Sequence, residues 1–109
     1  MEIDIFYLTQ GDRLPKLRRQ LFGPDGVPLN LTGATVVINM RGRDGMKITN
    51  GACTVLAPAT DGWVDYPWAV ADTDLAGTFN AKFRATLSGL PLSCPNYGVL
   101  TVTIDKALA

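Results

Sequence analysis

The chain has 109 residues, of which 47% are hydrophobic, and its ten Lys and Arg side chains balance its ten Asp and Glu side chains. This length fits a single domain, residues 1–109, with a core of its own, and the apolar content excludes a disordered chain. A net charge of zero gives little long-range attraction to nucleic acid or to anionic lipid, so we expect neither partner. A neutral and fairly apolar small protein suits one subunit of a multi-copy assembly.

Histidine is absent, which removes the commonest general base, metal ligand and triad partner. No nucleophile has a candidate base, so we predict no enzymatic activity and no cofactor or metal. The N-terminal residues 1–6 include Glu2 and Asp4 and do not form a signal peptide, so synthesis in the cytosol with reduced thiols is expected. We expect Cys53 and Cys94 to be buried and chemically idle, while a disulfide between them stays open. No apolar run reaches the roughly 20 residues of a membrane helix.

Alternation of apolar and polar residues predicts strands along the first half of the chain, and they are Ile3–Tyr7, Leu17–Phe22, Val27–Leu29, Ala34–Met40 and Ile48–Leu56. The turn at 23–26, with proline at its second position and glycine at its last, joins the second and third of these as an antiparallel hairpin. Arg41–Gly45 is predicted to be a charged hairpin tip. Gly51 marks a bulge or bend in the strand passage that follows.

The clearest pattern lies in residues 61–83. Val64, Tyr66 and Trp68 alternate with a second set that is predicted to face solvent, namely Trp63, Asp65 and Pro67. A second alternating run follows in residues 78–87, and its buried set is predicted to be Phe79, Ala81, Phe83, Ala85 and Leu87. A tight corner joins the two strands. Its predicted members are Asp72, whose carboxylate would accept from N–H groups near Asp74 and Leu75, then Asp74, Gly77 with a positive φ, and Phe79.

The end of the chain predicts a two-residue turn at Ser88-Gly89, an edge segment between Pro91 and Pro95, a last strand at Tyr97–Ile104 and a terminal stub at Asp105–Ala109. Seven to eight short strands without an amphipathic helix predict an all-β protein, an immunoglobulin-like antiparallel β-sandwich. A small barrel is the second interpretation. An edge at Ala34–Met40 or at Tyr97–Ile104 would let a neighbour add a strand.

Several side chains allow a binding interpretation beside a structural one. Clustered carboxylates at 61, 65, 72 and 74 would suit a cation, but the spacing lacks further ligands, so capping of the corner is favoured. Asp61 and Asp65 are the pair that an enzyme would need. Arg41 and Arg43 form a basic cluster suited to salt bridges within an assembly. Trp63, on the solvent side of its strand, and Tyr97 are candidate interface residues.

Five segments occur together in one order, and they are Gln10-Gly11-Asp12, Leu29–Val36, Gly62–Trp68, Asp72–Phe79 and Pro95–Val102. In this the chain resembles the N-terminal domain of phage baseplate upper proteins, immunoglobulin-like modules of phage tails and baseplates. Phe79 stands where immunoglobulin-type domains place the tyrosine of a tyrosine corner, so that hydroxyl-to-backbone bond cannot form.

The resemblance implies a virion structural role, with assembly in the host cytoplasm and other phage structural proteins as partners. The expected function is a docking or adaptor module of the tail, baseplate or fibre attachment. Receptor binding and trimerisation belong to further regions of longer family members and are not carried over. The alternatives are a capsid decoration protein and a carbohydrate-binding immunoglobulin-like module, with glycan as its partner.

Overall fold

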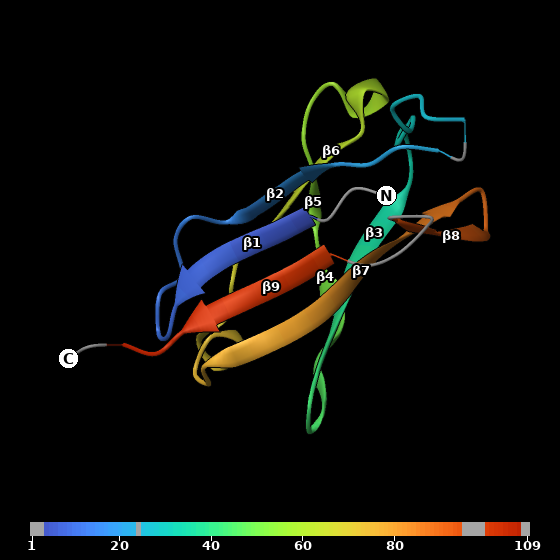
Figure 1. Ribbon diagram of the computed structural model, residues 1–109. Helices are drawn as coiled ribbons and strands as arrows, with labels where there is room; N and C mark the ends of the chain where they lie inside the picture. Colours follow the sequence, from blue (N-terminus) through green and yellow to red (C-terminus); the bar gives the residue numbers. More distant parts are fainter. Residues whose placement is uncertain (1–3, 24, 95–99, 108–109) are drawn as a thin grey trace.

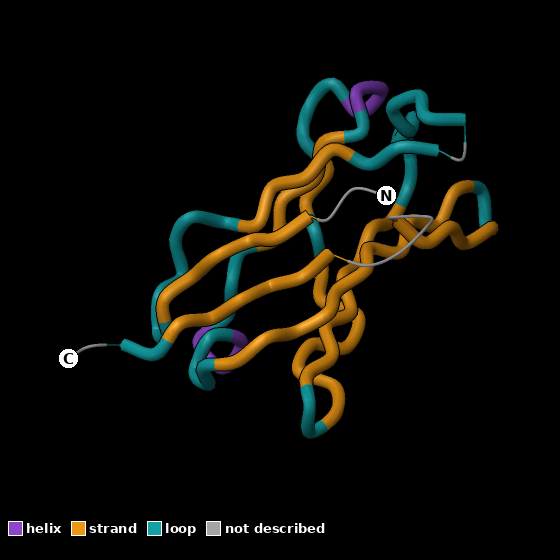
Figure 2. Tube along the Cα trace, in the orientation of Figure 1, coloured by secondary structure: helices purple, strands orange, loops and turns teal. Residues whose placement is uncertain are grey.

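The computed structural model describes residues 4–23, 25–94 and 100–107, and strands dominate it (Figures 1 and 2). The strands are β1 (Asp4–Thr9), β2 (Leu17–Gln20), β3 (Thr35–Gly42), β4 (Gly45–Ala52), β5 (Thr54–Val55), β6 (Trp63–Tyr66), β7 (Gly77–Leu87), β8 (Leu90–Cys94) and β9 (Leu100–Asp105). Two single 3₁₀ turns, η1 (Ala59–Asp61) and η2 (Val70–Asp72), flank β6. The prediction of an all-β sandwich is confirmed.

The strands form two sheets. The larger runs β1-β9-β7-β3-β4, with β8 paired to β7, and the smaller runs β2-β6-β5. β7 thus lies between β3 and β9, and β6 lies between β2 and β5, as the F and E strands do in immunoglobulin-like sandwiches. β1 pairs with β9 in parallel, with Asp4 opposite Leu100 and Thr9 opposite Asp105. This pair is the exception to the predicted antiparallel arrangement.

The inward side chains of both sheets make one core, and the alternation predicted for residues 63–85 places them correctly. Val64, Tyr66 and Trp68 are buried on one side, and Phe79, Ala81, Phe83 and Ala85 are buried on the other. Trp68 lies at the centre of an aromatic group, because its ring centroid is 5.5 Å from that of Tyr66 and 5.9 Å from that of Phe6. Its indole N–H donates to the carbonyl of Pro15 at 3.1 Å, which satisfies the polar atom of this buried side chain.

Several predicted turns are confirmed. Gly26 N–H donates to Gly23 C=O at 3.0 Å with φ +80° at Gly26, and Phe22 pairs with Pro28 across this turn. The β7–β8 turn at Ser88 and Gly89 has positive φ at both residues, 51° and 82°, the geometry that a tight two-residue hairpin favours.

Other predictions need correction. Ile48–Leu56 is not one strand, because the chain leaves the large sheet after Ala52 and enters the small sheet at Thr54. The bulge lies at Asn50, which has φ +52° and whose N–H donates to the side-chain oxygen of Asn39 at 2.8 Å, rather than at Gly51. Neither predicted edge is an edge: β3 lies between β7 and β4, and β9 lies between β1 and β7. Residues 97–99, with which the last strand was expected to begin, lie outside the described residues.

Candidate interaction surface

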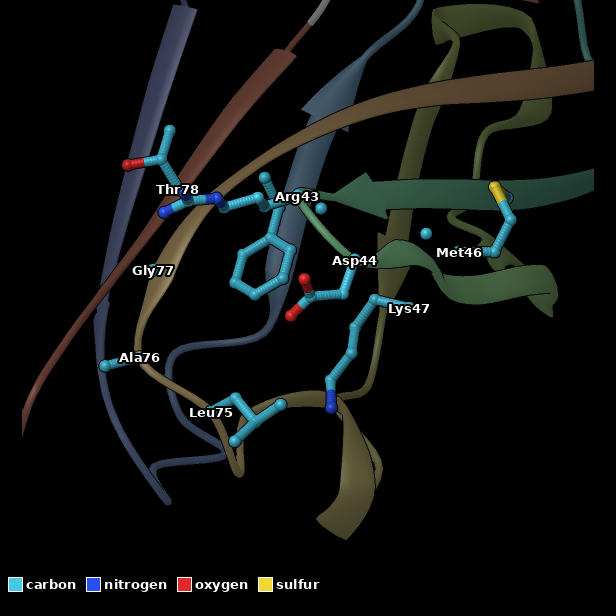
Figure 3. A pocket seen from close by; sticks show the side chains of 11 residues that line it. Arg43, Asp44, Met46, Lys47, Leu75, Ala76, Gly77 and Thr78 are labelled. Atoms are coloured by element: carbon cyan, nitrogen blue, oxygen red, sulfur yellow. The ribbon is translucent and has the colours of Figure 1, made fainter.

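A groove opens at one end of the sandwich, between the β3–β4 hairpin and the corner that leads into β7 (Figure 3). It encloses about 560 Å³ and is lined by residues 42–47 and 75–79, and we call it the tip groove. The register of β3 against β7, with Arg41 opposite Asn80, brings these two segments together. Two predicted turns that are separated by 27 residues, as Lys47 and Asp74 are, therefore form one surface feature.

The walls of the tip groove carry apolar side chains that solvent reaches. Leu75 is 56% exposed on the corner side, whereas Met46, which is 53% exposed on the hairpin side, directs its side chain away from the groove in Figure 3. In Figure 3 the side chain of Arg43 extends toward Thr78, and that of Asp44 points into the groove. A protein–protein contact usually combines apolar area with charged groups, and the tip groove offers both.

The floor of the groove depends on a glycine. Phe79 is buried on β7 against Gly42, and a Cβ built at Gly42 would lie 2.6 Å from two carbons of the phenyl ring. Only glycine at position 42 lets the hairpin approach the ring this closely. Phe79 was predicted as a packing residue of the corner, and its burial agrees with that role.

An ion pair links the two walls. Lys47 Nζ lies 2.5 Å from Asp74 Oδ1, and about half of the Asp74 side chain is exposed. A surface pair of this kind contributes roughly 0–1 kcal/mol, so its value is in orienting the corner relative to the hairpin. Asp74, expected to help form the corner, therefore acts across the groove.

The corner itself is held differently from the prediction. Asp72 Oδ2 accepts from the N–H of Ala69 at 2.8 Å and from the hydroxyl of Tyr66 at 2.5 Å. Asp72 is thus the third residue of η2 and its carboxylate turns back to the start of that turn, whereas the prediction directed it forward to Asp74 and Leu75. Burial, together with the hydrogen bond to Asp72, raises the pKa of Tyr66 far above its usual range. The positive φ predicted for Gly77 is confirmed at 152°.

Backbone and side-chain bonds tie the corner to the end of β1. Gly11 N–H donates to the carbonyl of Thr73 at 2.8 Å, and the side-chain amide of Gln10 donates to that of Asp74 at 2.8 Å. Two of the five segments that carry the resemblance, 10–12 and 72–79, are therefore neighbours in space. The hydroxyl of Thr73 is buried without a hydrogen-bond partner among the described residues.

Of the two remaining candidate interface residues that the structure describes, one lies far from the tip groove and one lies beside it. Trp63 opens β6 and follows η1, which lies at the opposite end of the molecule from η2 and the β3–β4 turn (Figure 2). It is 39% exposed, consistent with the predicted outward position. Arg41 is exposed on β3 beside the groove. Tyr97 lies outside the described residues.

The two carboxylates considered as a catalytic pair lie in different environments. Asp61 is exposed, whereas Asp65 is buried, contrary to the prediction of a wet face. Arg18, opposite Asp65 on the neighbouring strand, approaches its carboxylate to 3.7 Å. Asp65 therefore has a structural partner within its own sheet.

Cys53 is a free, half-buried thiol at the point where the chain changes sheets. Burial, with a smaller effect of the Asp65 charge, raises the pKa of Cys53 to about 12, so the thiol is protonated and unreactive at neutral pH. The side chain of Cys94 is outside the described part of the structure.

Among the described residues, no group of three or more His, Cys, Asp or Glu is placed to hold a metal ion. No helix within the described ranges is long and apolar enough to span a membrane. No known protein-family model matches the sequence, and no relative is found among curated proteins.

Proposed function

We propose that the chain is a non-enzymatic structural protein of a bacteriophage virion, a docking or adaptor module of the tail, baseplate or fibre attachment. The resemblance of five ordered segments to the N-terminal domain of phage baseplate upper proteins supports the virion role. The β-sandwich fold agrees with that resemblance, although fold alone does not specify function.

The observation that carries the docking role is the tip groove. Its exposed apolar side chain is Leu75, and the two segments of the groove are fixed by the β3–β7 register and by the Lys47–Asp74 pair. A rigid frame lowers the entropy lost when a partner docks, and apolar side chains in a hollow are the usual anchors of such a contact. The partner is another structural protein of the particle.

The experiment is incorporation of variants into particles. Leu75→Asp introduces a charge on the apolar wall of the groove and should abolish co-purification with particles while leaving the thermal midpoint unchanged. Leu90→Asp is the matched control, because Leu90 is a 72% exposed leucine in the β7–β8 hairpin, outside the groove. If Leu75→Asp enters particles as well as Leu90→Asp does, the groove is not the docking site. If the wild-type chain never co-purifies with particles, the virion role is wrong.

A second candidate is carbohydrate binding, and Trp63 is the observation that favours it. This half-exposed indole stands on the outer face of the small sheet, opposite Gln20, and an aromatic ring beside polar groups can stack on a sugar. Adding polysaccharide would then shift the tryptophan fluorescence, and Trp63→Phe would remove the shift because Trp68 is buried. Capsid decoration is distinguished by recovery of the chain with purified heads rather than with tails.

A further inference from the structure

The edges of the two sheets are protected unequally. Edge strands usually carry devices against pairing with other chains, such as charges, prolines, bulges or short length. β5 has two residues, β2 contains Arg18 on its solvent side, and β4 contains Lys47 and two register shifts against β3. β8, beside β7, contains Pro91. Each of these strands has at least one device.

β1 has such a device only at its first residue, Asp4, and none between Ile5 and Thr9. This segment contains no charge and no proline, and its register with β9 is unbroken. β1 is also the terminal strand of the large sheet, visible in Figure 1 beside β9 at the border of that sheet. The strand is therefore the least protected edge of the described structure.

Alternate residues of β1 direct their backbone groups toward the open side. In a parallel ladder, every second residue turns its N–H and C=O toward the partner strand. Gln10 N–H donates to Asp105 C=O at 2.7 Å, which continues the β1–β9 ladder, whereas Thr9 C=O accepts from Asp12 N–H outside the sheet. By this alternation the even-numbered residues Phe6 and Leu8 face β9. The backbone groups of Ile5 and Tyr7 face outward.

The outer side chains of this edge are apolar and exposed. Tyr7 is 63% exposed and Ile5 is 39% exposed, and their neighbours across the ladder are Thr103 and Thr101. Phe6 and Leu8 point the other way and pack on the core. A strand added here would cover two large apolar side chains and satisfy a row of backbone groups at the same time.

We propose that β1 pairs in antiparallel orientation with β1 of a second copy of this chain, forming a two-fold symmetric dimer with one sheet continuous across both copies. When β1 of one copy pairs in antiparallel orientation with β1 of the other about a two-fold axis, each outward N–H of one strand lies opposite an outward C=O of the other. The edge is therefore self-complementary. This pairing keeps odd-numbered residues opposite odd-numbered residues, so Ile5 and Tyr7 of both copies share one face. The net charge of zero means that two copies do not repel each other.

A single strand on each copy buries less surface than a permanent dimer needs, so the dimer is concentration-dependent. The β1–β1 contact does not involve the tip groove, and it does not depend on the virion role. Failure of either proposal is therefore separable from failure of the other.

Residue-resolved amide hydrogen exchange at low and high protein concentration tests the pairing. The amides of Phe6 and Leu8 should be protected at every concentration, because β9 binds them. Those of Ile5 and Tyr7 should exchange quickly in dilute protein and gain protection as sedimentation velocity reports dimer. Dimerisation without that gain, or a chain that stays monomeric at millimolar concentration, would overturn the proposal.

Variants identify the edge independently. Tyr7→Pro removes an outward N–H on each copy without removing a bond to β9, and it should raise the dimer dissociation constant about tenfold or more. Ile5→Lys places a charge on the edge and should have a similar effect. Thr101→Lys is the matched control, since it adds the same charge on the same face one strand inward and should leave the dimer in place. A dimer that survives Ile5→Lys but is lost in Leu75→Asp would place self-association at the tip groove and refute the β1 edge.

Discussion

The buried pair between Tyr66 and Asp72 offers the most direct test of how the corner is held. Both side chains are under 9% exposed, and one carboxylate oxygen accepts two bonds, from the Tyr66 hydroxyl and the Ala69 N–H. Asp72→Ala removes this shared acceptor and leaves the buried Tyr66 hydroxyl and the part-buried Ala69 N–H without a partner. Because each unsatisfied buried donor costs about 1–3 kcal/mol, we expect the free energy of unfolding to fall by about 2–4 kcal/mol.

Tyr66→Phe separates the two bonds. It removes the hydroxyl but keeps the ring in its 5.5 Å edge contact with Trp68, so only the hydrogen bond to the carboxylate is lost. A bond to a charged group is worth about 1.5–3 kcal/mol, and we expect a loss in that range. The double variant should lose less than the sum of the two single variants, because both changes remove the same bond.

Urea unfolding followed by tryptophan fluorescence measures these changes, since Trp68 lies in the core beside Tyr66. Asp72→Asn is the control, because the amide oxygen keeps a neutral acceptor and should cost only about 1 kcal/mol. Additive single changes, or an Asp72→Ala variant within about 0.5 kcal/mol of wild type, would refute the reasoning.

Three further predictions concern packing, pH and fluorescence. Gly42→Ala should lower the free energy of unfolding by about 1–3 kcal/mol through its clash with Phe79, and the cost should shrink in a Phe79→Leu background; an equal cost in both backgrounds would contradict the clash. Because the pKa of Cys53 is raised from 9.0 to about 12, the unfolded thiol loses its proton first as pH rises, so stability should fall between about pH 9 and pH 12. Denaturation at several pH values should show a smaller fall in Cys53→Ala. Acrylamide should quench Trp63 and not Trp68, so Trp63→Phe should leave fluorescence almost unquenchable, and strong residual quenching would place Trp68 in solvent.

The sequence predicted what local alternation determines. Burial of one face of β6 and β7 enforces a period of two, so the inward set from Val64 to Ala85 could be identified without a structure. The turns at Gly26 and Gly89 could also be predicted from the sequence, because their positive φ is a local requirement.

The sequence did not predict which strands that are distant in the chain become neighbours in a sheet. The edges were misplaced because β3 and β9 each have a second neighbour that is distant in the chain, β7 for β3 and β1 for β9, and these pairings have no local signal. Asp65 was placed on a wet face because its burial depends on the position of β6 between β2 and β5, which local alternation does not show. For the same reason the tip groove was visible only as two separate turns, and its existence follows from the register that sets Arg41 opposite Asn80.

The direction of the carboxylate of Asp72 was wrong for a different reason. Capping preferences favour N–H groups that follow an aspartate, but the buried Tyr66 hydroxyl and the Ala69 N–H lie before it and need an acceptor. A buried donor on a neighbouring element decided between two locally acceptable orientations.

The parallel pairing of β1 with β9 also determines how the molecule would respond to tension. Force applied before Asp4 and after Asp105 would pull the two strands in opposite directions along their own length. The pairs from Asp4–Leu100 to Thr9–Asp105 would then be strained together in shear, whereas a hairpin pulled at its open end loses its bonds one after another. Rupture of the sandwich would require simultaneous loss of that whole ladder. In a subunit held through both ends of its chain, the pairing of the first and last strands would therefore resist extension. The tip groove and the corner would bear the force only after that pairing had broken.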